Sequence, residues 1–133
     1  MFADFFVILF AAHLLSDYPF QTDHQAQHKA GCGAAGWRAN AAHATTHLAV
    51  SLVLVWLIGQ TLLSLPVSAV GMAAALAWVT ITHAVIDRRW PVARWMAWAR
   101  QAGFAQHGGA AHVDQTFHIA LGLLPAAVML ATL

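Results

Sequence analysis

Long apolar stretches dominate this sequence, and they limit what the chain can fold into more than any other feature. Mainly apolar residues fill four stretches, at 2–20, 41–65, 66–87 and 113–133. A helix that crosses a bilayer needs about 20 such residues. Charged residues make up only 8% of the chain, whereas a soluble domain carries about 25%. The sequence therefore predicts an all-α protein whose helices cross a membrane.

The connections between these stretches predict the order of the helices. The second stretch is followed directly by the third, with only a very short turn around residues 64–66, so these two helices should be antiparallel, with Pro66 in the first turn of the third helix. The connections at 21–40 and 88–112 are long and polar. In a chain of 133 residues we expect one domain. We predict a four-helix transmembrane bundle with up-down-up-down topology, kinked at Pro125 in its last helix.

The connection before the last stretch contains an amphipathic segment. Residues 91–101 combine tryptophan and methionine with two arginines, a composition that suits a helix lying in the headgroup region. The segment should therefore lie along the membrane surface between the third and fourth spans.

The cations are distributed unevenly along the chain. All six lie in the two long connections or at their edges: Lys29, Arg38, Arg88, Arg89, Arg94 and Arg100. Positively charged loops stay in the cytoplasm, so both connections are expected inside and both termini outside. Met1–Asp4 lacks the positive charge of a cleavable signal, and the first helix is therefore expected to be retained.

Each apolar stretch contains one pair of metal-binding side chains four residues apart, a spacing that places both on one helix face. The pairs are His13 and Asp17, His43 and His47, His83 and Asp87, and Asp114 and His118. A pair of this kind can also be a simple hydrogen bond between helices. Ionisable groups inside a membrane are nevertheless costly and usually functional, and here they recur in every span.

The position of each pair within its span predicts where the pairs meet. They lie at the C-terminal ends of the first and third stretches and at the N-terminal ends of the second and fourth. Alternating helices would bring all eight side chains to the cytoplasmic face. Imidazole and carboxylate ligands suit zinc, with iron or manganese as alternatives. Because one zinc ion takes about four ligands, we expect one ion with supporting residues, or two ions per chain.

Such a centre predicts a metal-dependent hydrolase acting on an anionic or lipid-like substrate. His24 and His112 are candidate catalytic residues, because histidine exchanges protons near neutral pH. The arginines of the cytoplasmic connections could hold an anionic group, although they also set topology.

Two other functions fit the same residues. Ionisable side chains in a membrane can form the path of a metal-ion or proton transporter or channel. They can also bind haem or a non-haem di-iron centre in a redox protein. The expected partners are the lipid bilayer and an anionic substrate, with a homo-oligomer as a further option and no nucleic acid.

The four motifs together resemble a known family. They read His13-Leu-Leu-Ser-Asp17-Tyr-Pro-Phe-Gln21-Thr-Asp23, His43-Ala-Thr-Thr-His47, Thr82-His83-Ala-Val-Ile-Asp87 and Asp114-Gln115-Thr-Phe-His118. In this order they are similar to the bacterial integral-membrane family called domain of unknown function 3307, and more loosely to membrane-bound metal-dependent hydrolases. The resemblance implies a polytopic fold and a shared polar site, and the expected location is the bacterial inner membrane.

Overall fold

All regular secondary structure is helical in the computed structural model, which describes residues 1–133. The prediction of an all-α protein is confirmed. The elements are α1 (Phe2–Asp17), α2 (Asp23–His28), α3 (Gly33–Leu54), the π-helical η1 (Val55–Leu62), α4 (Ala69–Ile86), α5 (Trp90–Trp98), α6 (Ala102–Gln106), α7 (Gly109–Phe117), the π-helical η2 (His118–Leu123) and α8 (Leu124–Thr132).

Three helical stretches are long and apolar enough, by length and composition, to cross a membrane. They are Gly33–Leu62 with 30 residues, Ala69–Ile86 with 18 and Gly109–Thr132 with 24. The first helix, α1, is as apolar but has 16 residues, which corresponds to about 24 Å at 1.5 Å per residue. It is therefore shorter than the three candidate spans.

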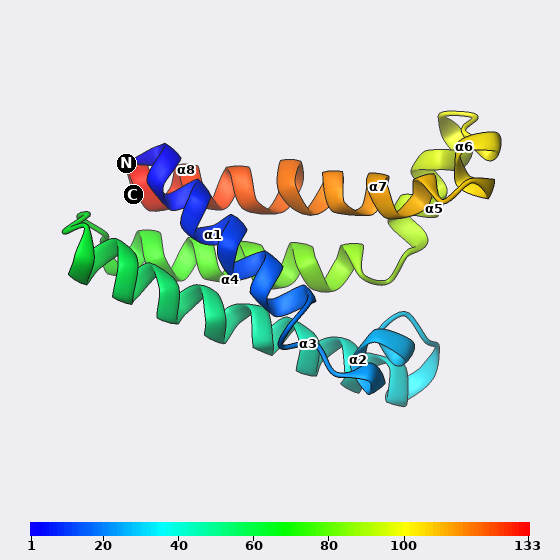
Figure 1. Ribbon diagram of the computed structural model, residues 1–133, viewed down its shortest axis with the longest axis horizontal. Helices are drawn as coiled ribbons and strands as arrows, with labels where there is room; N and C mark the ends of the chain where they lie inside the picture. The colour runs from blue at the N-terminus through cyan, green and yellow to red at the C-terminus, as the bar shows by residue number, and fades with distance from the viewer.

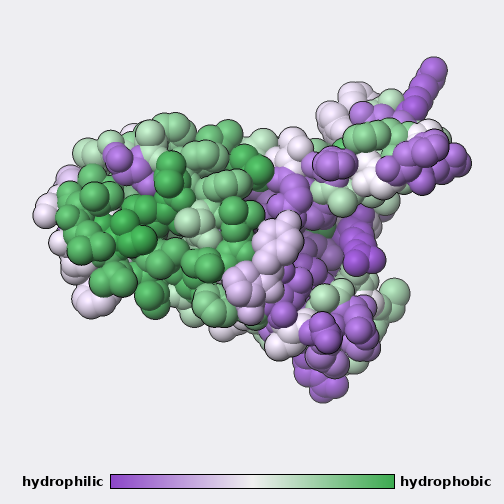
Figure 2. All heavy atoms as spheres, in the orientation of Figure 1, coloured by the Kyte–Doolittle hydropathy of each residue, from purple (hydrophilic) through white to green (hydrophobic).

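The long helices lie side by side, and both termini meet at one end of the molecule (Figure 1). The short helices α2, α5 and α6 lie at the opposite end, where the two long connections fold. Surface polarity follows the same division. In Figure 2 hydrophobic residues cover the end that holds the termini, and hydrophilic residues gather at the other end.

An apolar core fills the space between the long helices on the side of the termini. Its buried side chains come from α1, η1, α4, η2 and α8: Phe5, Ile8, Leu9, Val55, Ala75, Val79, Leu123, Ala126, Ala127 and Leu130. Small residues on α4 and α8 allow these helices to approach closely, as is usual when helices pack in membranes.

Several helices begin or end away from their expected boundaries. The second long helix begins at Gly33 rather than residue 41, because alanines among residues 33–40 favour helix despite their polar neighbours. Pro66 lies outside α4, whose first turn is capped by the Ser68 side chain. The last long helix begins at Gly109 rather than residue 113, and α1 ends at Asp17 rather than residue 20.

Pro125 interrupts the hydrogen bonds of the last long helix, and a tryptophan compensates for the interruption. Proline has no N–H to donate to the carbonyl of Leu121 one turn earlier. The Trp78 indole of α4 donates a 2.8 Å hydrogen bond to that oxygen. The preceding turn is the π-helical η2, a form that often accompanies such interruptions. Trp78 therefore connects α4 to the last long helix at the turn that Pro125 interrupts.

The amphipathic segment folds as α5 and packs across the polar end. Val92 and Met96 are buried against Ile86 of α4, with Phe117 of α7 beside them. Trp90, Trp95 and Trp98 remain exposed. This division of polar and apolar faces matches the sequence expectation for an interfacial helix.

Candidate metal centre

Four helices direct His and Asp side chains towards one largely buried region at the polar end of the apolar core. The eight residues are His13, Asp17, His43, His47, His83, Asp87, Asp114 and His118, hereafter the His/Asp cluster. The i, i+4 spacing aligns each pair on one helix face, and the packing of the helices turns these faces inward. All five histidines of the cluster are 3% exposed or less.

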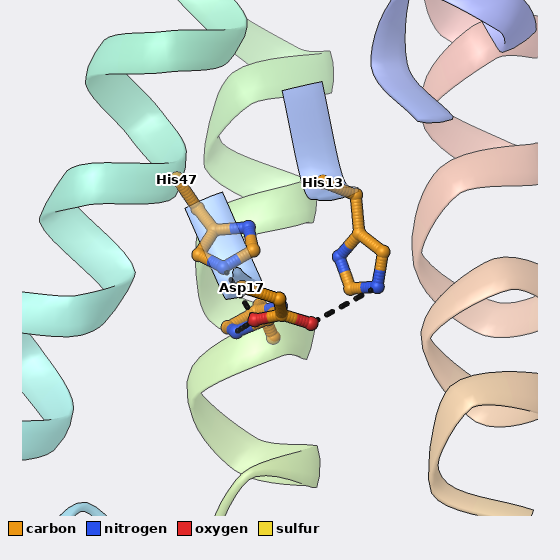
Figure 3. A group of neighbouring side chains, drawn as sticks. His13, Asp17 and His47 are labelled. Carbon is orange, nitrogen blue, oxygen red and sulfur yellow. Dashed lines mark hydrogen bonds and ion pairs between the residues drawn. The ribbon is translucent and has the colours of Figure 1, made fainter. Parts of the chain in front are cut away.

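Asp17 is one of two centres of the cluster. Its Oδ1 atom accepts hydrogen bonds from Nε2 of His43 and Nε2 of His47, both 3.1 Å long. Nε2 of His13 lies 3.3 Å from the other carboxylate oxygen. Figure 3 shows His13 and His47 approaching Asp17 from two different helices. A single carboxylate thus orients three imidazole rings.

Asp87 is the second centre, at the end of α4. Its Oδ2 atom lies 3.1 Å from Nε2 of His83 and 3.4 Å from Nε2 of His43. Nε2 of His118 lies 3.9 Å from its Oδ1 atom. Asp114, which is 25% exposed, lies 3.4 Å from Nδ1 of the same histidine and connects the cluster to the surface.

These contacts form three overlapping sets of ligand atoms, each within 4.8 Å of one another. The first is His13, Asp17, His47 and His83; the second is His43, His83 and Asp87; the third is Asp87, Asp114 and His118. Neighbouring sets share His83 or Asp87. The first set has the four ligands that a tetrahedral zinc ion takes.

Hydrogen bonding within the cluster leaves part of it unsatisfied. The Nδ1 atoms of His13, His43 and His47 are buried without a hydrogen-bond partner, and Nε2 of His83 and Nε2 of His118 lie near the Asp87 carboxylate without a hydrogen bond to it. A buried polar atom without a partner costs about 1–3 kcal/mol. Five imidazoles around two carboxylates therefore form a costly arrangement, and a cation that accepts electron pairs would lower its energy.

Lys29, the only lysine of the chain, enters the cluster from the connection after α2. Its Nζ atom lies 3.0 Å from Asp87 Oδ2 and 3.0 Å from His43 Nε2. The ammonium thus contacts two of the three ligands in the second set. Sequence reasoning treated Lys29 only as a loop cation. The single sequence signal was that one lysine stands among five arginines.

The loop that carries Lys29 is fixed by two contacts. The Arg88 guanidinium donates 2.7 Å hydrogen bonds to the carbonyl oxygens of Lys29 and Gly31 and stacks on the Trp37 ring. On the other side, a side-chain carbon at Gly36 would lie 1.9 Å from the Gly31 carbonyl oxygen. Only glycine permits this approach between loop and helix.

Three amide side chains contact the cluster or the backbone beside it. Gln115 contacts both members of one pair, with its Oε1 atom 3.0 Å from His13 Nε2 and its amide nitrogen 3.5 Å from Asp17 Oδ2. Gln21 donates to the backbone carbonyl of Asp17. Asn40, which sequence reasoning overlooked, is buried and donates to the carbonyl of Ala84 beside His83. Such contacts fix the orientation of ligands.

His24 and His112, the two expected catalytic histidines, do not join the cluster. Both side chains are exposed. The His24 ring stacks on that of His28 within α2, whose start is fixed by a capping box of Thr22 and Gln25. The His112 ring stacks on Phe104. Both histidines lie on helix faces that the long helices leave uncovered.

The charge of the cluster matches a divalent cation. Asp17, Asp87 and Asp114 contribute three negative charges, and Lys29 contributes one positive charge. The remainder is two negative charges when the histidines are neutral. Buried charge of this size is costly without a counterion, and one divalent ion balances it.

The profile of a protein family matches residues 5–132 of this sequence. The chain belongs to the family described as protein of unknown function (DUF3307). The match covers all four ligand pairs, so the resemblance noted from the motifs is confirmed. No curated protein and no solved structure matches this DUF3307 member.

Proposed function

We propose that this chain is a polytopic membrane metalloenzyme that hydrolyses an anionic or lipid-like substrate. In this proposal α1 joins the three candidate spans as a shorter fourth helix, which gives a four-helix up-down-up-down bundle. The main support is the convergence of five buried imidazoles and three carboxylates at one end of the apolar core. Each histidine retains a ring nitrogen without a hydrogen-bond partner, as a site built for a cation would.

The proposed resident ion is zinc, one per chain, at His13, Asp17, His47 and His83. This set supplies four ligands from three helices. Iron or manganese would also suit imidazole and carboxylate. The Lys29 ammonium takes the place of a second cation beside His43 and Asp87. Two divalent ions per chain would therefore require this side chain to move away.

A divalent ion in such a site activates water and polarises the bond to be broken. The surrounding residues would then orient the substrate and exchange protons. Asp114 is partly exposed and contacts His118, so it connects the buried ligands with solvent. Lys29 is placed to neutralise a substrate oxygen near Asp87. His24 and His112 lie outside the cluster and are less suitably placed for proton transfer.

The apolar core favours an enzyme over a transporter. A conduction path would have to continue from the cluster to the end where the termini lie. The interior there is filled by Phe5, Leu9 and Val55, all 0% exposed. The contacts among the five imidazole rings, with centroids 3.5–5.5 Å apart for the pairs around His13 and His83, favour a small ion over haem.

The proposed location is the bacterial inner membrane, with the termini outside and the cluster towards the cytoplasm. The positive-inside rule supports this orientation, because all cations lie in the connections at the polar end. Cys32, the single cysteine, is exposed at the start of α3. A membrane-impermeant thiol reagent should label it in permeabilised spheroplasts but not in intact ones. Labelling in intact spheroplasts would reverse the proposed orientation.

Elemental analysis of purified protein tests the metal directly. We expect about one zinc, iron or manganese per chain in protein never exposed to chelator. Asp17→Asn and His47→Ala should each lower this content at least tenfold, because each removes a ligand of the first set. Asp23→Asn and His24→Ala are the matched controls in exposed α2 and should retain the metal. A metal content near zero in the unaltered protein would refute the proposal.

A hydrolase assay then separates the enzyme from a transporter. Purified protein with its metal should cleave a phosphate ester, an acyl ester or an amide presented in mixed micelles, and the Asp17→Asn variant should not. Uptake of the same metal into proteoliposomes, without cleavage of any of these compounds, would instead identify a transporter.

A further inference from the structure

A cavity adjoins the His/Asp cluster at the polar end of the molecule. It measures about 730 Å³ and is lined by residues of α5, α6, α7 and the loops around them. Sites for small molecules commonly measure about 300–1,000 Å³. Asp87 and Asp114 of the cluster line it together with Lys29. Whatever occupies the cavity therefore lies against the proposed metal centre.

The lining of the cavity combines two kinds of side chain. Three cations, Lys29, Arg89 and Arg100, line it near the cluster and at the ends of α5. The remaining wall is largely apolar, with eight hydrophobic residues among the fourteen. Val92 and Met96 form part of this wall, and small alanines of α5 and α6 keep it open. An amphiphile with an anionic head and a hydrocarbon chain matches both parts.

The backbone at Arg89 and Arg100 supports a role for both side chains. Arg89 has φ of 64° at the start of α5, and Arg100 has φ of 56° just after its end. This left-handed region favours glycine or asparagine. Arginine at both positions is therefore unfavourable for the backbone. Strained residues of this kind are common at ligand sites, and here both contribute a guanidinium to the same cavity.

Exposed tryptophans place the cavity at the membrane surface. Trp95 and Trp98 lie on α5 with 44% and 76% of their surface exposed, and such residues are enriched where lipid meets water. In Figure 2 the region of α5 and α6 mixes hydrophilic and hydrophobic residues, at the end of the molecule away from the hydrophobic surface of the long helices. A molecule anchored in the bilayer could therefore reach the cavity, with its head group towards the cluster.

We propose that this cavity binds a single-chain phospholipid, its anionic head group among Lys29, Arg89 and Arg100 and its hydrocarbon chain against the apolar wall that includes Val92 and Met96. Arginine and lysine are the common partners of phosphate oxygens. As an assignment of the substrate class, this inference rests on the metal-dependent function proposed above. Lipid binding in the cavity can also be tested by itself, without any assay of hydrolysis.

Binding can be measured with fluorescent lysophosphatidic acid and protein in phosphatidylcholine nanodiscs. Unlabelled lysophosphatidic acid should displace the probe, while lysophosphatidylcholine and glycerol phosphate should compete at least tenfold less well. The first competitor lacks net negative charge and the second lacks the chain. Equal competition by glycerol phosphate would show a site for soluble phosphates and overturn the proposal.

Matched arginine variants test the contacts. Arg89→Gln and Arg100→Gln should each weaken binding about tenfold, the effect expected for one charge-assisted hydrogen bond. Arg94→Gln is the control, since Arg94 lies on the same helix but stacks over Trp90 and does not line the cavity. If all three variants lost lipid affinity equally, the lipid would be attracted by the basic surface in general and not by the cavity, and the proposal would fail.

The apolar wall is tested in the same way. Ala97→Phe would fill space within the cavity and should weaken lipid binding at least tenfold, whereas Ala41→Phe on the exposed face of α3 should not. Metal content is measured on every variant. Weaker lipid binding with the metal content unchanged supports the cavity as the lipid site. Loss of metal in the arginine variants or in Ala97→Phe contradicts it. Lipid binding by a protein that holds no metal would refute only the hydrolase.

Discussion

Arg88 donates a 2.7 Å hydrogen bond to the backbone carbonyl of Lys29, 59 residues earlier in the chain. Arg88 directly follows Asp87, whose carboxylate lies 3.0 Å from the Lys29 ammonium. Adjacent residues at the end of α4 therefore hold both the backbone and the side chain of Lys29. This double contact places the ammonium within the His/Asp cluster.

Replacement of Lys29 should change how many ions the protein binds. Lys29→Met keeps the length of the side chain but removes the cation beside His43 and Asp87. We expect the zinc content to rise from about one to about two ions per chain, because the second ligand set becomes free and the negative charge increases. Elemental analysis after zinc saturation measures this.

Arg38→Gln is the control for loss of a cation elsewhere, as Arg38 lies on the exposed side of α3. A zinc content of one in both variants would contradict the idea that Lys29 takes the place of a second ion.

Loss of the Arg88 side chain should release the Lys29 loop without emptying the first ligand set. Arg88→Gln removes two hydrogen bonds to loop carbonyls and the stacking on Trp37. Hydrogen exchange measured by mass spectrometry should accelerate at least tenfold at residues 29–33. Exchange in α4 and metal content should stay unchanged. Unaltered exchange in the loop would show that its position does not depend on Arg88.

Gly36→Ala should destabilise the protein by about 1–3 kcal/mol, the usual cost of an added methyl group without space. The new carbon would lie 1.9 Å from the Gly31 carbonyl oxygen, and the loop that carries Lys29 would have to move. Gly103→Ala is the matched control, because no atom lies within 4 Å of its added carbon. Thermal unfolding in detergent compares them, and equal melting temperatures would contradict the close approach.

The helical fold and the grouping of the four His and Asp pairs could be predicted from the sequence, because both depend on local spacing. Residues four apart share a helix face, and apolar length determines which segments can span a bilayer. The position of Lys29 could not be predicted, because it depends on Arg88 and Gly36. Arg88 is 59 residues away in the sequence, and the sequence pattern gives no sign that Gly36 lies close to the loop. The helical form of residues 33–40 was missed because glycines and polar residues obscured it. His24 was chosen by residue type, but the capped α2 turns it to solvent.

Arg100→Gly should separate stability from binding. Arg100 follows α5 at the position where helices often end with a left-handed glycine, so glycine should relieve strain by about 1 kcal/mol. We expect a melting temperature equal to or above that of the parent, together with weaker binding of lysophosphatidic acid. A lower melting temperature would show that the guanidinium serves the fold instead of a ligand.

Trp78 and Pro125 should be energetically coupled, and a double-mutant cycle measures this coupling. Trp78→Phe removes the indole donor from the Leu121 carbonyl and should cost about 0.6–1.7 kcal/mol, the range for hydrogen bonds between membrane helices. In a Pro125→Ala background the restored backbone N–H can donate to that oxygen instead. The same Trp78→Phe change should then cost less than half as much. Trp56→Phe, at an exposed tryptophan of η1, is the control and should cost the same in both backgrounds. Additive losses for Trp78→Phe and Pro125→Ala would show that the indole bond does not compensate for the proline, and that η2 alone absorbs the interruption.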